Sequence, residues 1–403
     1  MTRKRGLRAL PPEALDGKRA LVRVDFNVPL QDGRVTDDTR IRAAAPTIQY
    51  LREKGARVVL LSHLGRPAGG PDPKLSLRQV VRDVERVLAT TVEFIPDPVA
   101  GVAATKRLPR GGVALVENTR FWPGEERNDP ALAQIFAALG DFYVDDAFGS
   151  AHRAHTSTEG LAHTLKPAVA GFLMERELRF LGEALERPRR PFVAVLGGAK
   201  ISGKIDVIEA LLPKVDEILV GGAMANTFFL ALGFGVGGSL VERDKVDLAK
   251  GLLARAGKKL ILPRGAVVAP SLERVAERRE VLSDKVPLDC AVFDIDETTR
   301  LDYRARLLRA KTVVWNGPMG VFEPPPFDAG TRAVAVAMVE ATRRGATTVV
   351  GGGDSAAAVA GLTSKLTHVS TGGGASLEFL EGRTLPGVLA LEQNAGKFAG
   401  GVR

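Results

Sequence analysis

Two lysines follow a glycine pair in residues 196–204 (LGGAKISGK), and they are the first candidates for binding an anion. An apolar run at 191–195 precedes this stretch and an apolar-periodic segment at 205–212 follows it, which predicts a strand, a glycine loop and a helix. Glycines let a ligand approach the backbone closely. On a helix, Lys200 and Lys204 would lie one turn apart on one face and repel each other unless an anion lay between them. The spacing therefore predicts a polyphosphate site.

The same stretch partly matches a phosphate-binding loop. Residues 198–204 read G-x-x-x-x-G-K, but Ile205 stands where such loops place the Ser or Thr that holds a metal. A glycine-rich turn with solvated lysines is the structural alternative. This stretch alone leaves both interpretations open.

Polar and basic residues follow the strands predicted in the first half of the chain. Ligands of open α/β sheets bind beyond the carboxyl ends of the strands. Arginine suits carboxylate and phosphate, and histidine adds a donor of adjustable charge, so we expect a small molecule with both kinds of anion. Taken singly, His63 is equally suited to an ordinary loop, and a lone arginine is more often a solvated surface charge. His152 and His155 are expected only to order their loop. The candidates are Asp25, Asn27, His63, Arg66, Arg120 and Arg153, with Arg40 just before a helix.

The strands predicted in the second half end instead in glycine, which suggests backbone contact with a flat, phosphorylated ligand. Helices are expected after the glycines at 351–353 and 372–374, the second with bare N–H groups directed at an anion. Asp354 either caps its helix together with Ser355 or holds Mg²⁺ on nucleotide phosphates. No G-x-G-x-x-G follows an early strand, which disfavours NAD enzymes. These strand ends are Gly197–Gly198, Gly221–Gly222, Asn316–Gly317, Gly351–Gly353 and Gly372–Gly374.

Short apolar, β-branched runs alternate with helical patterns along the whole chain. The helical patterns include 41–54, 76–88 and 331–343. Such alternation predicts βαβ units and an α/β fold with two doubly wound, mostly parallel, Rossmann-like sheets of about five strands each, in preference to a barrel. The predicted strands are 20–24, 58–62, 113–116, 142–144, 192–196, 217–220, 260–262, 312–315, 347–350 and 368–370.

One amphipathic helix, stopped by Pro188 and Pro191, separates the two halves. We expect an acid-binding domain at 1–172, a hinge helix at 173–190 and a nucleotide-binding domain at 191–387. The glycine-rich stretch 392–403 is expected to fray or to pack back, and the tail from about 388 to return to the first domain. This division of labour is typical of a kinase that closes its domains to exclude water.

Composition narrows the class of protein. The chain has 403 residues, a net charge of +9 and one cysteine, Cys290, which excludes an internal disulfide and favours the cytoplasm. It contains no run suited to a bilayer, no signal-peptide pattern and no zinc-ligand spacing. Dispersed arginines, few aromatics and no long basic run favour small anions over nucleic acid as partners.

Ten motifs occur in one order along the chain, and together they resemble the phosphoglycerate kinase family. The resemblance implies reversible transfer of a phosphoryl group from 1,3-bisphosphoglycerate to ADP, giving 3-phosphoglycerate and ATP with Mg²⁺, in a monomer without membrane or nucleic-acid partners. The motifs are VRVDFNVP, DDTRIRAAAPTI, LSHLGRP, LVENTRF, DAFGSAHRAHTS, LGGAKISGKI, GGAMANTF, VVWNGPMGVFE, GGGDSAAAV and STGGGASLEFLEG.

The resemblance also implies roles for single residues. Arg40, Lys200 and Lys204 would act on the transferring phosphoryl group, and Glu323 would accept from the ribose hydroxyls. Asp354 would face the metal, and Gly372, Gly373 and Gly374 would form an anion-binding helix start. Phosphoglycerate would be bound by Asp25, Phe26, Asn27, Arg40, His63, Leu64, Gly65, Arg66, Arg120 and Arg153, and the nucleotide by Gly197, Gly198, Lys204, Gly221, Gly222, Asn316, Glu323, Gly352, Gly353, Asp354 and Ser355.

Two positions depart from the family pattern. Asp296 stands where the family usually has a glycine beside the adenine pocket, so its carboxylate is expected either to reshape that pocket or to point to solvent. Ser355 replaces a frequent threonine and keeps the hydroxyl.

We consider three alternatives to the phosphoglycerate kinase function. They are a two-domain kinase for another acidic metabolite, a basic nucleic-acid-binding module and a catalytically silent relative. The scarcity of aromatics disfavours the second, and the intact Arg40, Lys200, Lys204 and Asp354 disfavour the third.

Overall fold

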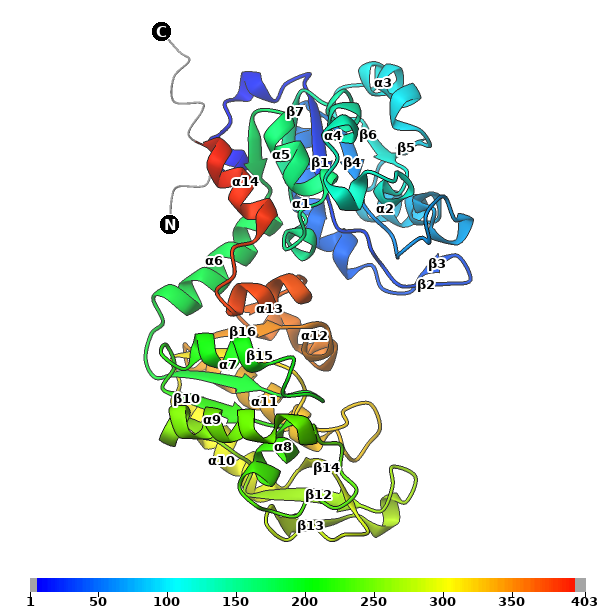
Figure 1. Cartoon of the computed structure of the whole chain (residues 1–403). Coiled ribbons are helices and arrows are strands. Elements are labelled where there is room, and N and C mark those ends of the chain that lie inside the picture. Colours follow the sequence, from blue (N-terminus) through cyan, green and yellow to red (C-terminus); the bar gives the residue numbers. More distant parts are fainter. Residues whose placement is uncertain (1–5, 396–403) are drawn as a thin grey trace. The chain divides into compact units, whose positions relative to one another are not determined.

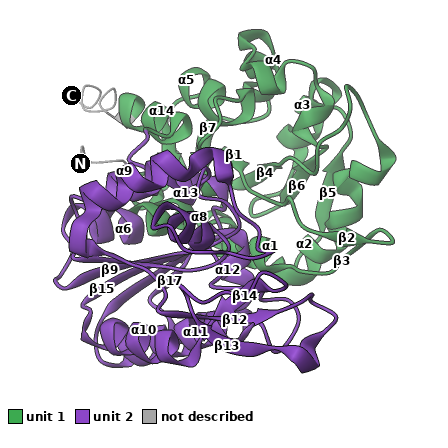
Figure 2. Ribbon diagram, turned by 60° about the horizontal axis from the view of Figure 1, so that its bottom comes forward, with its two compact units in different colours: residues 1–178, 384–403 green, residues 179–383 purple. Residues whose placement is uncertain are grey.

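The computed structural model describes residues 6–395, so the part of the predicted tail beyond Ala395 lies outside the described residues. The chain divides into two compact units (Figure 2). The first extends to Leu178 and takes up the chain again from Thr384, and the second is Arg179–Arg383. The division falls within helix α6 (Phe172–Glu186).

In the described part of the first unit, six parallel strands form one sheet in the order β5-β6-β4-β1-β7-β8 (Figure 1). Every residue of β6 and β7 is buried, as expected for parallel strands that are covered on both faces. β1 pairs with β4 on one side and with β7 on the other, so the carboxyl ends of these strands bring segments together that are distant in the sequence. The strands are β1 (Arg19–Arg23), β4 (Arg57–Leu61), β5 (Val92–Ile95), β6 (Val113–Val116), β7 (Phe142–Asp145) and β8 (Ala168–Ala170).

Helices connect these strands, and aspartates begin two of them. The side chain of Asp97 accepts from the N–H of Ala100, and Asp129 caps the next helix in the same way. The last helix packs against α5 and β8, and Asn394 Nδ2 donates to the carbonyl of Ala162 at 2.7 Å (Figure 1). Besides α6 the elements are α1 (Thr39–Glu53), α2 (Val81–Leu88), α3 (Pro98–Arg107), α4 (Pro130–Ala137), α5 (Leu161–Thr164), α14 (Pro386–Ala395) and the hairpin β2 (Leu30–Gln31) and β3 (Arg34–Val35).

The second unit, described throughout, contains a parallel sheet in the order β11-β10-β9-β15-β16-β17. Counted along this unit the order is 3-2-1-4-5-6, which is that of doubly wound nucleotide-binding sheets. The chain reverses direction across the sheet between β9 and β15, and ligands bind at such a switch point. The strands are β9 (Phe192–Leu196), β10 (Glu217–Val220), β11 (Leu260–Ile261), β15 (Thr312–Asn316), β16 (Thr347–Gly351) and β17 (His368–Val369).

A small antiparallel sheet, ordered β13-β12-β14, is inserted between β11 and β15. Among residues 6–395, no helix combines the length and the apolar character needed to cross a membrane. The strands of the insertion are β12 (Gly265–Ala269), β13 (Arg279–Leu282) and β14 (Ala291–Ile295), and the helices of the unit are α7 (Ile205–Leu211), α8 (Met224–Ala231), α9 (Val246–Ala256), α10 (Glu297–Arg309), α11 (Ala329–Arg343), α12 (Gly353–Ala358) and α13 (Gly374–Leu380).

The predicted fold class is confirmed, and all ten predicted strands are present within a residue or two of their expected bounds. Each parallel sheet has one strand more than the expected five, counted over the described residues. In the first unit, β5 and β8 were not predicted. The antiparallel insertion in the second unit was also missed.

Candidate active site

The first group of predicted site residues lies beyond the carboxyl ends of β1, β4, β6 and β7. Asp25 follows β1 and is 8% exposed, and Arg40, in the first turn of α1, donates to its Oδ2 at 2.7 Å. Burial acts to raise the pKa of Asp25, but the charges of Arg40 and Arg23 hold it below its usual value. Asp25 is therefore an ionised acceptor that orients Arg40.

The loop after β4 is held against the loop after β1. The N–H of Gly65 donates to Asn27 Oδ1 at 2.9 Å, and the N–H of Phe26 donates to Ser62 Oγ at 2.8 Å. Leu64 exchanges two hydrogen bonds with the buried amide of Asn118. These contacts position His63, whereas Arg66 is exposed at the end of the loop.

Two further arginines lie after β6 and β7. Burial lowers the pKa of Arg120, and this arginine pairs with Glu126 at 3.2 Å while donating to the carbonyl of Gly65. Arg153 Nε donates to His152 Nε2 at 3.1 Å. Burial, aided by the nearby charges of Arg120 and other arginines, lowers the pKa of His155 to about 4, so this imidazole is neutral at pH 7. The backbone N–H of His155 donates to Thr158 Oγ1 at 3.2 Å. Any residue except proline could make this bond, so the predicted loop-ordering role of the histidine side chain stays a prediction.

Sequence reasoning missed a buried polar network behind this group. Arg23, the last residue of β1, is 1% exposed and contacts Ser157 and His63. Glu125 is fully buried and accepts from the backbone and hydroxyl of Ser157. The one signal available in the sequence was an arginine at the end of β1, placed between Val22 and Val24.

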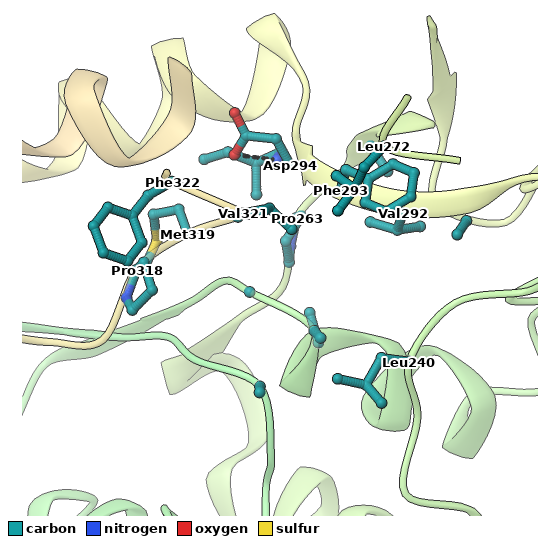
Figure 3. A pocket seen from close by; sticks show the side chains of 18 of the residues that line it. Leu240, Pro263, Leu272, Val292, Phe293, Asp294, Pro318, Met319, Val321 and Phe322 are labelled. Carbon is teal, nitrogen blue, oxygen red and sulfur yellow. Dashed lines mark hydrogen bonds between the residues drawn. The ribbon is translucent and has the colours of Figure 1, made fainter. Parts of the chain in front are cut away.

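The second unit contains a pocket of about 680 Å³ at the switch point between β9 and β15 (Figure 3). Leu272, Val292 and Phe293 from the antiparallel insertion line one side, and Pro318, Met319 and Phe322 after β15 line the other. Most of the exposed lining is apolar, which suits a flat ring. Of the predicted residues, those that line it are Gly198, Gly222, Glu323 and Asp354.

The two lysines are not arranged as predicted. Helix α7 begins only at Ile205, with Lys204 at its N-cap, and Lys200 lies exposed in the loop before it. The expected stacking of both ammonium groups on one helical face is therefore wrong, because residues 202–204 form a turn. Lys204 Nζ contacts Asn316 Oδ1, and burial lowers the pKa of Lys204 to about 8.

The glycine loop before α12 resolves the alternatives for Asp354. The N-cap of α12 is Gly352, with φ +92°, and no side chain caps the helix. Asp354 lies in the first turn, exposed at the edge of the pocket, so the capping alternative is wrong. Ser355 is buried instead, and its Oγ accepts from the N–H of Gly317 at 2.6 Å.

Several glycines are required by contacts between the loops themselves. A Cβ on Gly197 would lie 2.0 Å from the carbonyl oxygen of Pro318. One on Gly222, where φ is +68°, would lie 2.5 Å from the backbone of Gly198. By contrast, nothing lies within 4 Å of the Cβ position of Gly353, so its surroundings are open. Helix α13 begins at Gly374, as predicted.

Comparison with known proteins assigns the chain to a family. The sequence model described as "Phosphoglycerate kinase" matches residues 12–383. The chain belongs to the phosphoglycerate kinase family. Over 387 residues it is 59% identical to the phosphoglycerate kinase of Chloroflexus aurantiacus, covering 93% of this chain and 96% of that protein. Its identity to that of Chloroherpeton thalassium is 53% over 384 residues, covering 93% and 96%.

Solved phosphoglycerate kinases have the same fold. The structure from Coxiella burnetii matches with a TM-score of 0.89 at 43% identity, covering 98% of this chain and all of that one. The Pyrococcus horikoshii enzyme matches with a TM-score of 0.85 at 33% identity and the same coverage.

Neither expectation for Asp296 holds. Asp296 is 7% exposed and caps α10, where it accepts from the N–H of Thr299 at 2.9 Å. Its neighbours Asp294 and Ile295 line the pocket, but Asp296 does not. The carboxylate thus caps a helix, and it neither lines the pocket nor points to solvent.

Proposed function

We propose that this chain is a phosphoglycerate kinase, a phosphotransferase with a carboxyl group as acceptor. It catalyses the reversible transfer of a phosphoryl group from 1,3-bisphosphoglycerate to ADP, giving 3-phosphoglycerate and ATP. The observation that carries the proposal is the 59% identity that extends over nearly the whole length of a named phosphoglycerate kinase. The site residues of both units agree chemically with the two substrates.

The first unit is proposed to bind the phosphoglycerate. Several arginines lie near the carboxyl ends of its strands, among them Arg40, Arg120 and Arg153. Arginine can form the bidentate hydrogen bonds that the carboxylate and the phosphate of the substrate require. Asp25 and Asn27 order the site and accept from the substrate hydroxyl. Phe26, Leu64 and Gly65 supply the loop backbone, and His63 and Arg66 complete the set.

The second unit is proposed to bind ADP or ATP, with the adenosine in the apolar pocket beside Gly197, Gly198, Gly221 and Gly222. The phosphates would lie over Lys204 and the open backbone at Gly352 and Gly353, with Glu323 accepting from the ribose. One observation favours this placement. Asn316 Nδ2 is a buried donor that has no hydrogen-bond acceptor among the described residues, next to Lys204. A phosphate oxygen would satisfy it.

The residues fit Mg²⁺ carried on the nucleotide phosphates. Mg²⁺ favours one or two carboxylates plus phosphate oxygens, and Asp354 offers one exposed carboxylate near Lys204. Across the described residues, no group of three or more His, Cys, Asp or Glu side chains could hold a metal without other ligands. When bound, Mg²⁺ would neutralise phosphate charge.

The reaction requires that both substrates are positioned correctly and that positive charge lies near the transferring phosphoryl group. In the ATP-forming direction the nucleophile is a phosphate oxygen of ADP and the leaving group is a carboxylate, so neither needs proton transfer. We propose that the phosphoryl group is stabilised during its transfer by Arg40, Lys200 and Lys204. The helix start at Gly372, Gly373 and Gly374 would assist them. Because one substrate is assigned to each unit, we propose a hinge motion about α6 that excludes water.

We further propose that the enzyme acts as a monomer in the cytoplasm. The single cysteine and the glycolytic reaction support this compartment. Gel filtration with light scattering tests the first part, since a dimer would give twice the 42.9 kDa mass of the chain.

A coupled assay tests the activity. Purified protein with 3-phosphoglycerate, ATP and Mg²⁺ should turn over only when all three are present, and Lys204→Ala should abolish most of the rate. Turnover with another carboxylate in place of 3-phosphoglycerate, and none with 3-phosphoglycerate itself, would overturn the proposal.

A further inference from the structure

The side chain of Arg23 is buried within the first unit and reaches three elements. Its Nε donates to Ser157 Oγ at 2.8 Å, and its Nη2 lies 3.1 Å from His63 Nδ1 and 3.4 Å from Ser150 Oγ. Its Nη1 donates to the carbonyl of Val24. The guanidinium is thus held on several sides with one N–H directed at an imidazole of the candidate active site.

The counterion of Arg23 is Glu125, and the hydroxyl of Ser157 lies between the two side chains. Glu125 Oε2 accepts from the N–H of Ser157 at 2.9 Å, and its Oε1 accepts from the Ser157 hydroxyl. Burial raises the pKa of Glu125, and the charge of Arg23 opposes that rise. A carboxylate, a hydroxyl and a guanidinium therefore form a fixed chain that ends at His63.

The contact with Arg23 determines which nitrogen of His63 carries the proton. Arginine has donors only and keeps its charge in proteins, so the Nδ1 atom that it contacts must be the acceptor. In a neutral imidazole the proton is then on Nε2. Burial lowers the pKa of His63 well below its usual range. The charges of Arg23, Arg120 and Arg40 lower it further, against the opposing effect of Asp25.

We infer that Arg23 is a positioning residue for substrate binding: held by Ser157 and Glu125, it fixes His63 as a neutral imidazole whose Nε2–H donates to the phosphoglycerate. This inference rests on the proposed function for the identity of the ligand. A buried guanidinium is costly unless it is fully hydrogen-bonded, and an aliphatic residue would pack the end of β1 at lower cost. An aliphatic residue could not supply the N–H that contacts His63 Nδ1.

The ring nitrogens of His63 can be observed directly. Two-bond ¹H–¹⁵N NMR correlation on protein without ligand should show Nδ1 unprotonated and Nε2 protonated at pH 7, and this state should persist at pH 6. The His63→Gln variant assigns the signals among the five histidines. A proton on Nδ1, in either the neutral or the charged ring, would overturn the inference whether or not the protein turns over 3-phosphoglycerate.

Variants test whether the network acts on the substrate. Ser157→Ala and Arg23→Lys should each raise the KM for 3-phosphoglycerate about tenfold, the effect of weakening one hydrogen bond to a charged group. The KM for ATP should stay unchanged, and the Nδ1 signal of His63 should shift. Ser157→Ala keeps the inference testable if Arg23→Lys fails to fold.

Arg19 provides the matched control. It lies at the opposite end of β1 and pairs with Asp141 at 2.6 Å, away from His63. Arg19→Met should lower stability without changing either KM or the His63 signals. If Ser157→Ala changes the melting temperature alone, as Arg19→Met does, Arg23 is a structural residue and the inference fails.

Discussion

If Lys204 binds the nucleotide phosphates as proposed, its lowered pKa predicts that nucleotide binding depends on pH. Burial brings this pKa from 10.5 to about 8, so the free protein is half deprotonated at pH 8. Phosphate oxygens of a bound nucleotide favour the ammonium form and restore its charge. Binding at pH 8 should then take up about half a proton per nucleotide at Lys204.

The coupling between protonation of Lys204 and nucleotide binding also determines how the affinity for MgATP changes with pH. Below pH 7 nearly all of the free protein carries the Lys204 charge, and at pH 9 only about a tenth does, so the Kd for MgATP should rise about tenfold between pH 7 and 9. Isothermal titration calorimetry at pH 8 in two buffers of different ionisation enthalpy measures the proton uptake, and titrations across the range measure the Kd.

Lys204→Arg is the matched control because a guanidinium keeps its charge over this range. It should bind MgATP with no proton uptake at pH 8 and with a flat pH profile. If wild-type protein took up no proton, or if Lys204→Arg took up as much as wild type, the assignment of Lys204 to the nucleotide phosphates would be refuted.

Three substitutions test other parts of the site. Arg40→Ala should lower kcat about 100-fold, as loss of one preorganised donor does, with a smaller change in KM; a normal kcat with only a raised KM would contradict its role on the transferring group. Asp296→Ala should lower the free energy of unfolding by about 1 kcal/mol through loss of the α10 cap, while the KM for ATP stays constant; a changed KM would place Asp296 in the pocket after all. Gly197→Ala should lower stability by about 1–3 kcal/mol, because its Cβ meets the Pro318 backbone, and should weaken ATP binding; an unchanged melting temperature would show that the loops can separate without penalty.

Part of the site could be located from the sequence because of how parallel sheets are built. Buried parallel strands appear as continuous apolar runs, and the residues that follow them converge at one edge. Asp25, His63, Arg120 and Arg153 were found in this way. The antiparallel insertion was not predicted: β13 is mostly exposed and carries no apolar run, whereas the buried apolar run of β12 was overlooked. Residues of β12 and β14 line one side of the candidate nucleotide pocket.

By itself, the sequence determined the class of fold, the strands and the residues that follow each of them, since these depend on local hydrophobic pattern. The ordered motifs likewise determined the family. Only the tertiary structure decided that Lys200 lies outside α7, that Asp296 caps a helix and that Asp354 does not. It also brought Arg23, Glu125 and Ser157 into one network with His63. Such partners are far apart along the chain, and whether a polar group is buried, and against what, depends on packing that no local pattern contains.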